Sequence, residues 1–340
     1  MSDEEKIMKK NKELEEKMKV SFDRFTKKVL SLKSVVANLL MGSAEEYKDC
    51  SFAEVMSCLD TDPKVGEEPV DDSFIMMDNS GGETVSVNDG LRSFDTKFKV
   101  KLPQSYKEKH KQDERVSVMV NMESQKSSNV GYPMEARGIY YLSRLISSQF
   151  NVEFSKSEFS KILKAYSYWI CMNVPDNEAN TITRYSFKPE HLVGYHPDYP
   201  HKYDLMTLVM IKIGKNKSDE KITGLLYSLF KEIPLNGLNQ ETKEKLEKDY
   251  GIKFTEEFIE EADGMCVLSK EILDMGMEKG MEKGRKEGRE EGMEKGREKG
   301  AIERALNIAE KLRKIGMPED KIAEIVGIDK ETLEGAMNNK

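Results

Sequence analysis

Two runs of alternating apolar and polar residues near the middle of the chain constrain its fold most strongly. The segment SFDTKFKVKL, residues 93–102, places apolar or β-branched side chains at every second position and Asp95 between them. The segment RVSVMVNMESQ, residues 115–125, alternates in the same way, with Glu123 on the face opposite its valines. Because successive side chains of a strand point to opposite faces of a sheet, both runs predict β-strands. A polar connection joins them, so we expect an antiparallel pair.

The remaining patterns predict helices and further strands around this pair. Helical spacing or apolar runs mark the segments 21–59, 132–150, 159–175, 205–214, 222–230 and 241–252. Of these, 159–175 passes from a helical pattern into a strand, and 205–214 has the continuous apolar character of a buried strand. Residues 60–92 are rich in Asp, Gly, Ser, Pro and Asn and predict a long loop. This order predicts an α/β domain with a mixed sheet flanked by helices over roughly residues 20–270.

The two acidic residues of the strand pair are the main candidates for chemistry. If the strands pair, Asp95 and Glu123 approach closely, and their mutual repulsion is costly unless a cation lies between them. Mg²⁺ suits carboxylate oxygens and retains several water molecules. Gln125 shares the strand face of Glu123, because residues i and i+2 point the same way, and is placed to orient a water. The alternative is that both carboxylates lie solvated on an exposed strand face.

The wider context of these residues resembles a known family. The segments FDTKFKV, VNMESQKSSNVGYPMEARGIYYLSRLISSQF and YSYWICMNVPDNEANTITRYSF resemble the PD-(D/E)xK nuclease-family transposases, also called recombination-promoting nucleases. The resemblance covers roughly residues 20–300 and is strongest over 116–185. It implies a restriction-endonuclease-like core and a metal-dependent DNA endonuclease of mobile-element origin. By position, Asp95 and Glu123 would bind Mg²⁺, with Mn²⁺ as a substitute, and Gln125 would be the third catalytic residue.

The chain departs from the parent nuclease pattern at the third position of this motif. Gln125 occupies the place of a lysine and supplies no positive charge. Lys126 is adjacent, but the strand period directs it to the opposite face unless a bulge intervenes. A second hypothesis is therefore a catalytically degenerate nuclease fold that binds DNA or oligomerises without cutting.

Four basic residues near the motif are candidates for contacts with DNA. They are Lys97, Lys126, Arg137 and Arg144. Arg137 and Arg144 share a helix face with Tyr141, and an arginine binds phosphate through two parallel hydrogen bonds. The alternatives are a helix face paired with surface acids for the arginines, and a solvated strand face for Lys97.

Charge and composition limit the classes of function. The net charge of −8 excludes a uniformly basic nucleic-acid coat but allows a local basic groove. The first 20 residues are charged throughout and lack the apolar core of a signal peptide, and no apolar run reaches the length of a membrane span. The four cysteines form no CxxC pair. We therefore expect a cytoplasmic protein with no membrane partner.

The two ends of the chain differ in composition from the predicted nuclease-like domain, residues 21–270. Residues 1–20 form a charged lead-in, and residues 271–300 contain a repeat with glycine at every fourth position between Glu, Lys, Arg and Met. Each glycine costs a helix roughly 1 kcal/mol relative to alanine, which favours a labile helical spacer. The alternative is a close helix–helix contact in a homodimer. Residues 301–340 predict a small tail resembling a helix-turn-helix, with helices ended by Gly316 and Gly327.

Overall fold

The computed structural model divides the chain into two compact units, residues 1–270 and residues 271–340. The residues that it describes are 3–59, 64–65, 95–113, 115–127, 131–197 and 199–328. Most of the long loop predicted for residues 60–92 lies outside the described residues.

Among the described residues, six strands form one mixed sheet in the order β1-β2-β3-β4-β6-β5. The strands are β1 (Lys64–Val65), β2 (Thr96–Lys101), β3 (Ser117–Ser127), β4 (Lys164–Asn173), β5 (Thr181–Ser186) and β6 (Met206–Lys212). Strands β2 and β3 run antiparallel with Phe98 opposite Val120, as the alternating pattern predicted. Strand β4 is parallel to both β3 and β6, whereas β5 is antiparallel to β6. The predicted α/β fold with a mixed sheet is therefore confirmed.

Helices precede, connect and follow these strands. They are α1 (Asp3–Leu30), α2 (Lys33–Ser43), α3 (Phe52–Cys58), α4 (Gln104–Lys109), α5 (Met134–Ser147), α6 (Pro200–Tyr203), α7 (Lys221–Tyr227), α8 (Ile233–Asn236), α9 (Gln240–Tyr250), α10 (Glu256–Lys314) and α11 (Glu319–Val326). Helix α5 begins directly after Pro133, because a proline disfavours the helical conformation of the residue before it. Helix α1 runs without interruption through the expected lead-in and beyond it.

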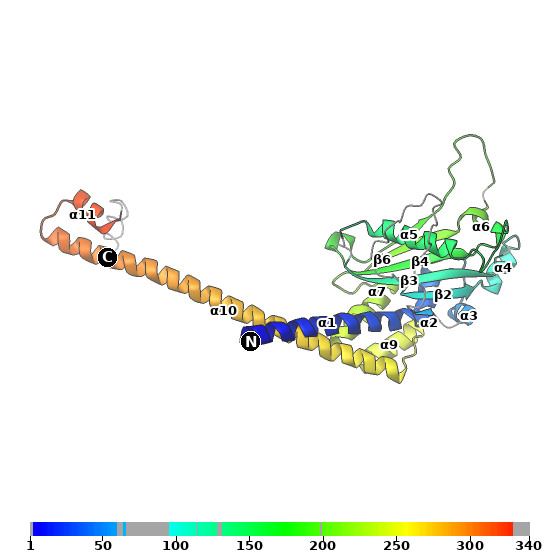
Figure 1. Ribbon diagram of the computed structural model, residues 1–340, viewed down its shortest axis with the longest axis horizontal. Coiled ribbons are helices and arrows are strands. Elements are labelled where there is room, and N and C mark those ends of the chain that lie inside the picture. Colours follow the sequence, from blue (N-terminus) through cyan, green and yellow to red (C-terminus); the bar gives the residue numbers. More distant parts are fainter. Residues whose placement is uncertain are drawn as a thin grey trace, which may run out of the picture. The chain divides into compact units, whose positions relative to one another are not determined.

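Helices cover both faces of the sheet (Figure 1). Helices α1, α2 and α7 pack on one face, where Val120 of β3 joins the main hydrophobic core. Helix α5 covers the other face, where Leu142 packs in a second core with Trp169 of β4. A Cβ atom at Gly138 would lie 2.7 Å from Leu208 Cδ1, so glycine allows α5 to approach β6 closely. Strand β3 is therefore buried on both faces over most of its length.

A buried ionic cluster lies beside the amino-terminal end of β3. Arg115 donates from Nε and from a terminal nitrogen to Asp113, at 2.8 Å and 2.5 Å. Lys164 donates to Asp204 at 2.7 Å, and its ammonium lies 3.4 Å from Glu46. Because each buried charge has an opposite partner, the cluster avoids most of the cost of removing ions from water.

The second unit contains the remainder of α10 and α11. The glycine repeat is part of α10, and a Cβ atom at any of its glycines from Gly276 to Gly300 would meet nothing within 4 Å. Ala309 and Ile322 are buried against each other, and Gly327 ends α11 in the left-handed conformation at φ 67°. The end of the predicted tail, residues 329–340, lies outside the described residues. Across the described chain, no helix combines the length and the apolar character needed to cross a membrane.

Candidate metal and DNA site

The two candidate carboxylates lie side by side at one end of the β2–β3 pair. Asp95 immediately precedes β2, and Glu123 lies one step beyond the paired residues Thr96 and Met122. The backbone amide of Asp95 donates to Glu123 Oε1 at 3.2 Å. The backbone amide of Ser124 donates to Asp95 Oδ2 at 3.0 Å. Each carboxylate is therefore held by a backbone amide of the strand that carries the other.

Both carboxylates are withdrawn from solvent, which corrects the alternative of a solvated, exposed strand face. Glu123 is 2% exposed on the face covered by α5, and Asp95 is partly buried. Burial raises the pKa of Glu123 well above its usual value, and the charge of Asp95 raises it further. Burial also raises the pKa of Asp95, although the amide of Ser124 and the charge of Lys27 oppose this increase. The pair therefore holds two negative charges only at a considerable cost.

The donor atoms at this place fit a hard divalent cation. Besides the two carboxylates, Asn121 lies on the same strand face as Glu123, and its buried Oδ1 has no hydrogen-bond partner among the described residues. Magnesium commonly binds through one or two carboxylates and keeps water in its other positions. No cluster of three or more His, Cys, Asp or Glu side chains suited to a metal occurs in the described ranges. Asp95 and Glu123 would therefore hold the ion together with neutral oxygens and solvent.

Gln125 and Lys126 occupy opposite faces of β3. Gln125 is partly buried, two residues beyond Glu123 and opposite Cys171 of β4. The ammonium of Lys126 lies 5.9 Å from the centre of the Phe22 ring, on the side of the sheet covered by α1. Because neighbouring strand residues alternate, Lys126 does not occupy the place of the motif lysine. Its exposed position is compatible with the predicted contact to DNA.

Aromatic residues hold Arg137 in the second core. Its guanidinium donates to the hydroxyls of Tyr132 and Tyr141, each at 3.0 Å. It also lies 5.3 Å from the centre of the Trp169 ring, within the range of a cation–π contact. The positive charge of Arg137 lowers the pKa of Glu123. Arg137 is thus oriented by aromatic side chains rather than by the surface acids considered from sequence.

The other candidate DNA contacts lie near the motif in varied surroundings. Lys97 is partly buried in β2 opposite Asn121. Lys99, which shares the strand face of Asp95, forms an ion pair with Glu153 at 2.7 Å. Arg144 is partly buried in the last turn of α5. Contact of these side chains with DNA stays a prediction.

Helix α1 brings a basic residue to the carboxylate pair that the sequence analysis missed. The hydroxyls of Thr26 and Ser124 are 3.2 Å apart, and Ser124 directly follows Glu123. Lys27 comes next along the helix, and its ammonium donates to Asp23 at 2.8 Å. The negative charges of Asp95 and Glu123 both raise the pKa of Lys27, after the larger effect of its bond to Asp23. The available signal was the helical spacing of Asp23 and Lys27, which by itself indicates only a surface ion pair.

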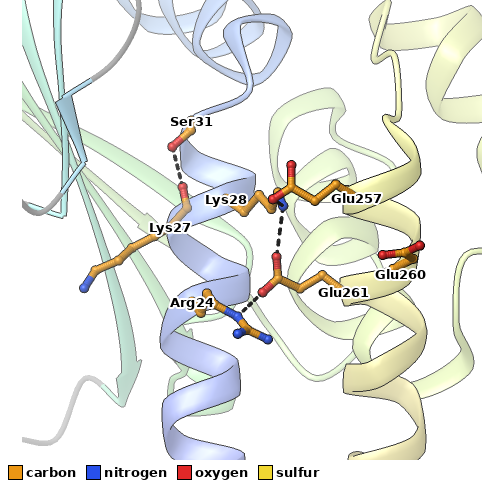
Figure 2. A pocket seen from close by; sticks show the side chains of 7 residues that line it. All are labelled: Arg24, Lys27, Lys28, Ser31, Glu257, Glu260 and Glu261. Carbon is orange, nitrogen blue, oxygen red and sulfur yellow. Dashed lines mark hydrogen bonds and ion pairs between the residues drawn. The ribbon is translucent and has the colours of Figure 1, made fainter.

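Ion pairs fasten α1 to the first turns of α10 on a different side of the helix. Figure 2 shows Arg24 and Lys28 directed toward α10, whereas Lys27 extends toward the strands. Arg24 pairs with Glu261, and Lys28 lies 2.5 Å from Glu257. Arg24 and Lys28 therefore join α1 to α10 and point away from the carboxylate pair.

The site is defined by the chain's own residues: a buried carboxylate pair, two amide side chains on the same strand face and nearby cations. Comparisons of the chain with protein-family models, with curated proteins and with solved structures find no match.

Proposed function

We propose that this protein is a metal-dependent DNA endonuclease that hydrolyses phosphodiester bonds. The observation that carries the proposal is the pairing of Asp95 with Glu123, joined through reciprocal backbone hydrogen bonds at the end of two paired strands. The resemblance to PD-(D/E)xK transposases had assigned the same two residues to Mg²⁺ from sequence. A nuclease core within the mixed sheet is part of this proposal.

The electrostatics of the pair support a cation as its natural partner. Two adjacent carboxylates with raised pKa values destabilise the folded protein when both are ionised. A divalent cation would remove that repulsion, which explains how such a pair is tolerated in a buried place. When bound, Mg²⁺ or Mn²⁺ would neutralise negative charge that develops on a phosphodiester during hydrolysis.

The surrounding residues have distinct tasks in the proposed reaction. Ser124 and Asp95 donate backbone hydrogen bonds that fix the orientation of the two carboxylates. Gln125 presents an amide that donates to a phosphate oxygen or accepts from a water. Lys126, exposed on the other face of β3, contributes sequence-independent attraction to the DNA backbone.

The test is cleavage of supercoiled plasmid by the purified protein in Mg²⁺ or Mn²⁺. We expect nicking or linearisation that EDTA abolishes and that Asp95→Asn and Glu123→Gln both remove. Asp176→Asn is the matched control, because Asp176 forms an exposed ion pair with Lys215 at 3.1 Å and should leave cleavage unchanged. Cleavage that survives in the Asp95 and Glu123 variants would refute their assignment.

A second candidate function is a degenerate nuclease fold that binds DNA or assembles without cutting. Gln125, at the place of the motif lysine, is the observation that favours it. This alternative predicts that the wild-type protein binds DNA without cutting any plasmid, linear duplex or single strand in either metal. It also predicts that Asp95→Asn and Glu123→Gln leave DNA binding unchanged.

A further inference from the structure

The contact between α1 and β3 links the amino-terminal helix directly to the carboxylate pair. Thr26 of α1 meets Ser124 through their hydroxyls at 3.2 Å. The amide of the same Ser124 donates to Asp95 Oδ2 at 3.0 Å. One residue of β3 therefore contacts the helix through its side chain and an acidic ligand candidate through its backbone. Lys27 follows Thr26 in α1, and the negative charges of Asp95 and Glu123 both act on its ammonium.

Lys27 is a side chain of α1 that extends toward the sheet. It leaves α1 toward the strands, on a different side of the helix from Lys28 (Figure 2). Its stem is partly buried, with the side chain 27% exposed, while Asp23 binds its ammonium from the preceding helical turn. The long stem positions the charge at the edge of the site and leaves the ammonium accessible to a solvent-borne phosphate.

We propose that Lys27 supplies the positive charge that Gln125 cannot provide, by donating a hydrogen bond to a non-bridging oxygen of the scissile phosphate. This inference rests on the proposed nuclease function and adds a catalytic residue to it. The ammonium of Lys27 would thus reach the site from α1, which lies about 100 residues before Gln125 in the sequence.

Three other basic residues of this region have contacts of their own. Arg137 is held by two tyrosine hydroxyls against Trp169. Lys126 lies over Phe22 on the α1 side of β3, and Lys28 is bound by Glu257. Lys27 pairs with Asp23, whose side chain is exposed, and ion pairs with an exposed member are weak. Exchange of Asp23 for a phosphate oxygen therefore requires little energy.

The assigned role leaves the reaction balanced. The oxygen of a water forms a bond to phosphorus, the bond from phosphorus to the leaving oxygen breaks, and its electron pair stays on that oxygen. The proton released by the water compensates the charge of the leaving oxygen. Lys27 neither gains nor loses a proton, since its ammonium acts only on the negative charge that grows on the non-bridging oxygens.

The experiment compares Lys27→Met, Lys27→Arg and the matched control Lys28→Met in the full chain. Lys28 is adjacent in sequence and faces α10, so its replacement tests general damage to α1. Three quantities are measured for each protein: single-turnover plasmid cleavage, Mn²⁺ affinity by calorimetry without DNA, and the melting temperature.

We expect Lys27→Met to slow cleavage by about 100-fold or more, the scale of a lost transition-state contact, and Lys27→Arg to recover at least a tenth of the wild-type rate. We expect Lys27→Met to bind Mn²⁺ as tightly as the wild type or more tightly, because a charge that repels the ion has been removed. Lys28→Met should cleave within about threefold of the wild type.

Each other outcome overturns the assignment in a distinguishable way. If the wild-type protein cuts and Lys27→Met cuts equally well, the role of Lys27 is wrong and the nuclease function stands. If Lys27→Met loses Mn²⁺ binding, melts much lower, or is slowed only as much as Lys28→Met is slowed, Lys27 is a structural residue. If the wild type cuts no DNA, the nuclease function fails and the role of Lys27 fails with it.

Discussion

Replacement of Glu123 by glutamine should abolish cleavage and at the same time stabilise the metal-free protein. Glu123 is 2% exposed beside the charge of Asp95. At an effective dielectric constant of about 20, two unit charges that nearly touch repel each other by about 3 kcal/mol. The variant loses the charge-assisted character of the bond from the Asp95 amide, which costs about 1 kcal/mol. The free energy of unfolding should therefore rise by about 2 kcal/mol.

The stabilisation that Glu123→Gln provides depends on pH, because the pKa of Glu123 differs between the folded and unfolded protein. The folded-state pKa of Glu123 is raised above its ordinary value of 4.5. A carboxyl group with a raised folded-state pKa contributes stability below its ordinary pKa, and this contribution is lost as the pH rises through the folded-state value. The advantage of Glu123→Gln should therefore be close to zero at pH 4 and should grow as the pH increases above about 4.5.

The assay is thermal unfolding followed by circular dichroism in EDTA at several pH values. An increase of about 2 kcal/mol corresponds to about 5 °C in the melting temperature of a domain of this size. Addition of Mg²⁺ should stabilise the wild type, because the ion binds the folded state, and should have little effect on the variant. The predicted repulsion would be refuted if Glu123→Gln were less stable than the wild type at pH 7.5. It would also be refuted if the gain in stability over the wild type were the same at pH 4 and at pH 8.

Three further predictions concern other parts of the molecule. Arg115→Met should lower the free energy of unfolding by about 3–5 kcal/mol in urea titrations, because it leaves the buried carboxylate of Asp113 without its cationic partner; an unchanged midpoint would contradict this. Gly288→Ala and Gly292→Ala should each stabilise α10 by about 1 kcal/mol in calorimetry, because nothing lies within 4 Å of either Cβ position; a loss of stability together with loss of a dimer in light scattering would instead indicate the homodimer contact. Burial raises the pKa of Cys171 to about 11, so its thiol should resist alkylation by iodoacetamide at pH 8 in the folded protein and react only in denaturant, as mass spectrometry would show.

Local patterns in the sequence were sufficient for much of the first unit. The alternation around Asp95 and Glu123 predicted both strands and their antiparallel pairing, because side-chain direction in a strand depends only on position. Helical spacing over 132–150 predicted α5, and Gly327 predicted the end of α11, because glycine adopts the left-handed conformation without strain. Strand β5 was missed because it lies at the edge of the sheet, where its exposed residues carry little apolar pattern.

The sequence by itself therefore determined most of the helices and strands and the chemical identity of the carboxylate pair, whereas only the tertiary structure decided the environment of that pair. Burial of Glu123 depends on how the second core under α5 packs against the sheet, and that packing changes both pKa values of the pair. The approach of Lys27 depends on the docking of α1 on the sheet, where Thr26 meets Ser124, a residue far away in sequence. Periodicity describes neighbours along one strand or helix, but charge and burial depend on which distant elements come together.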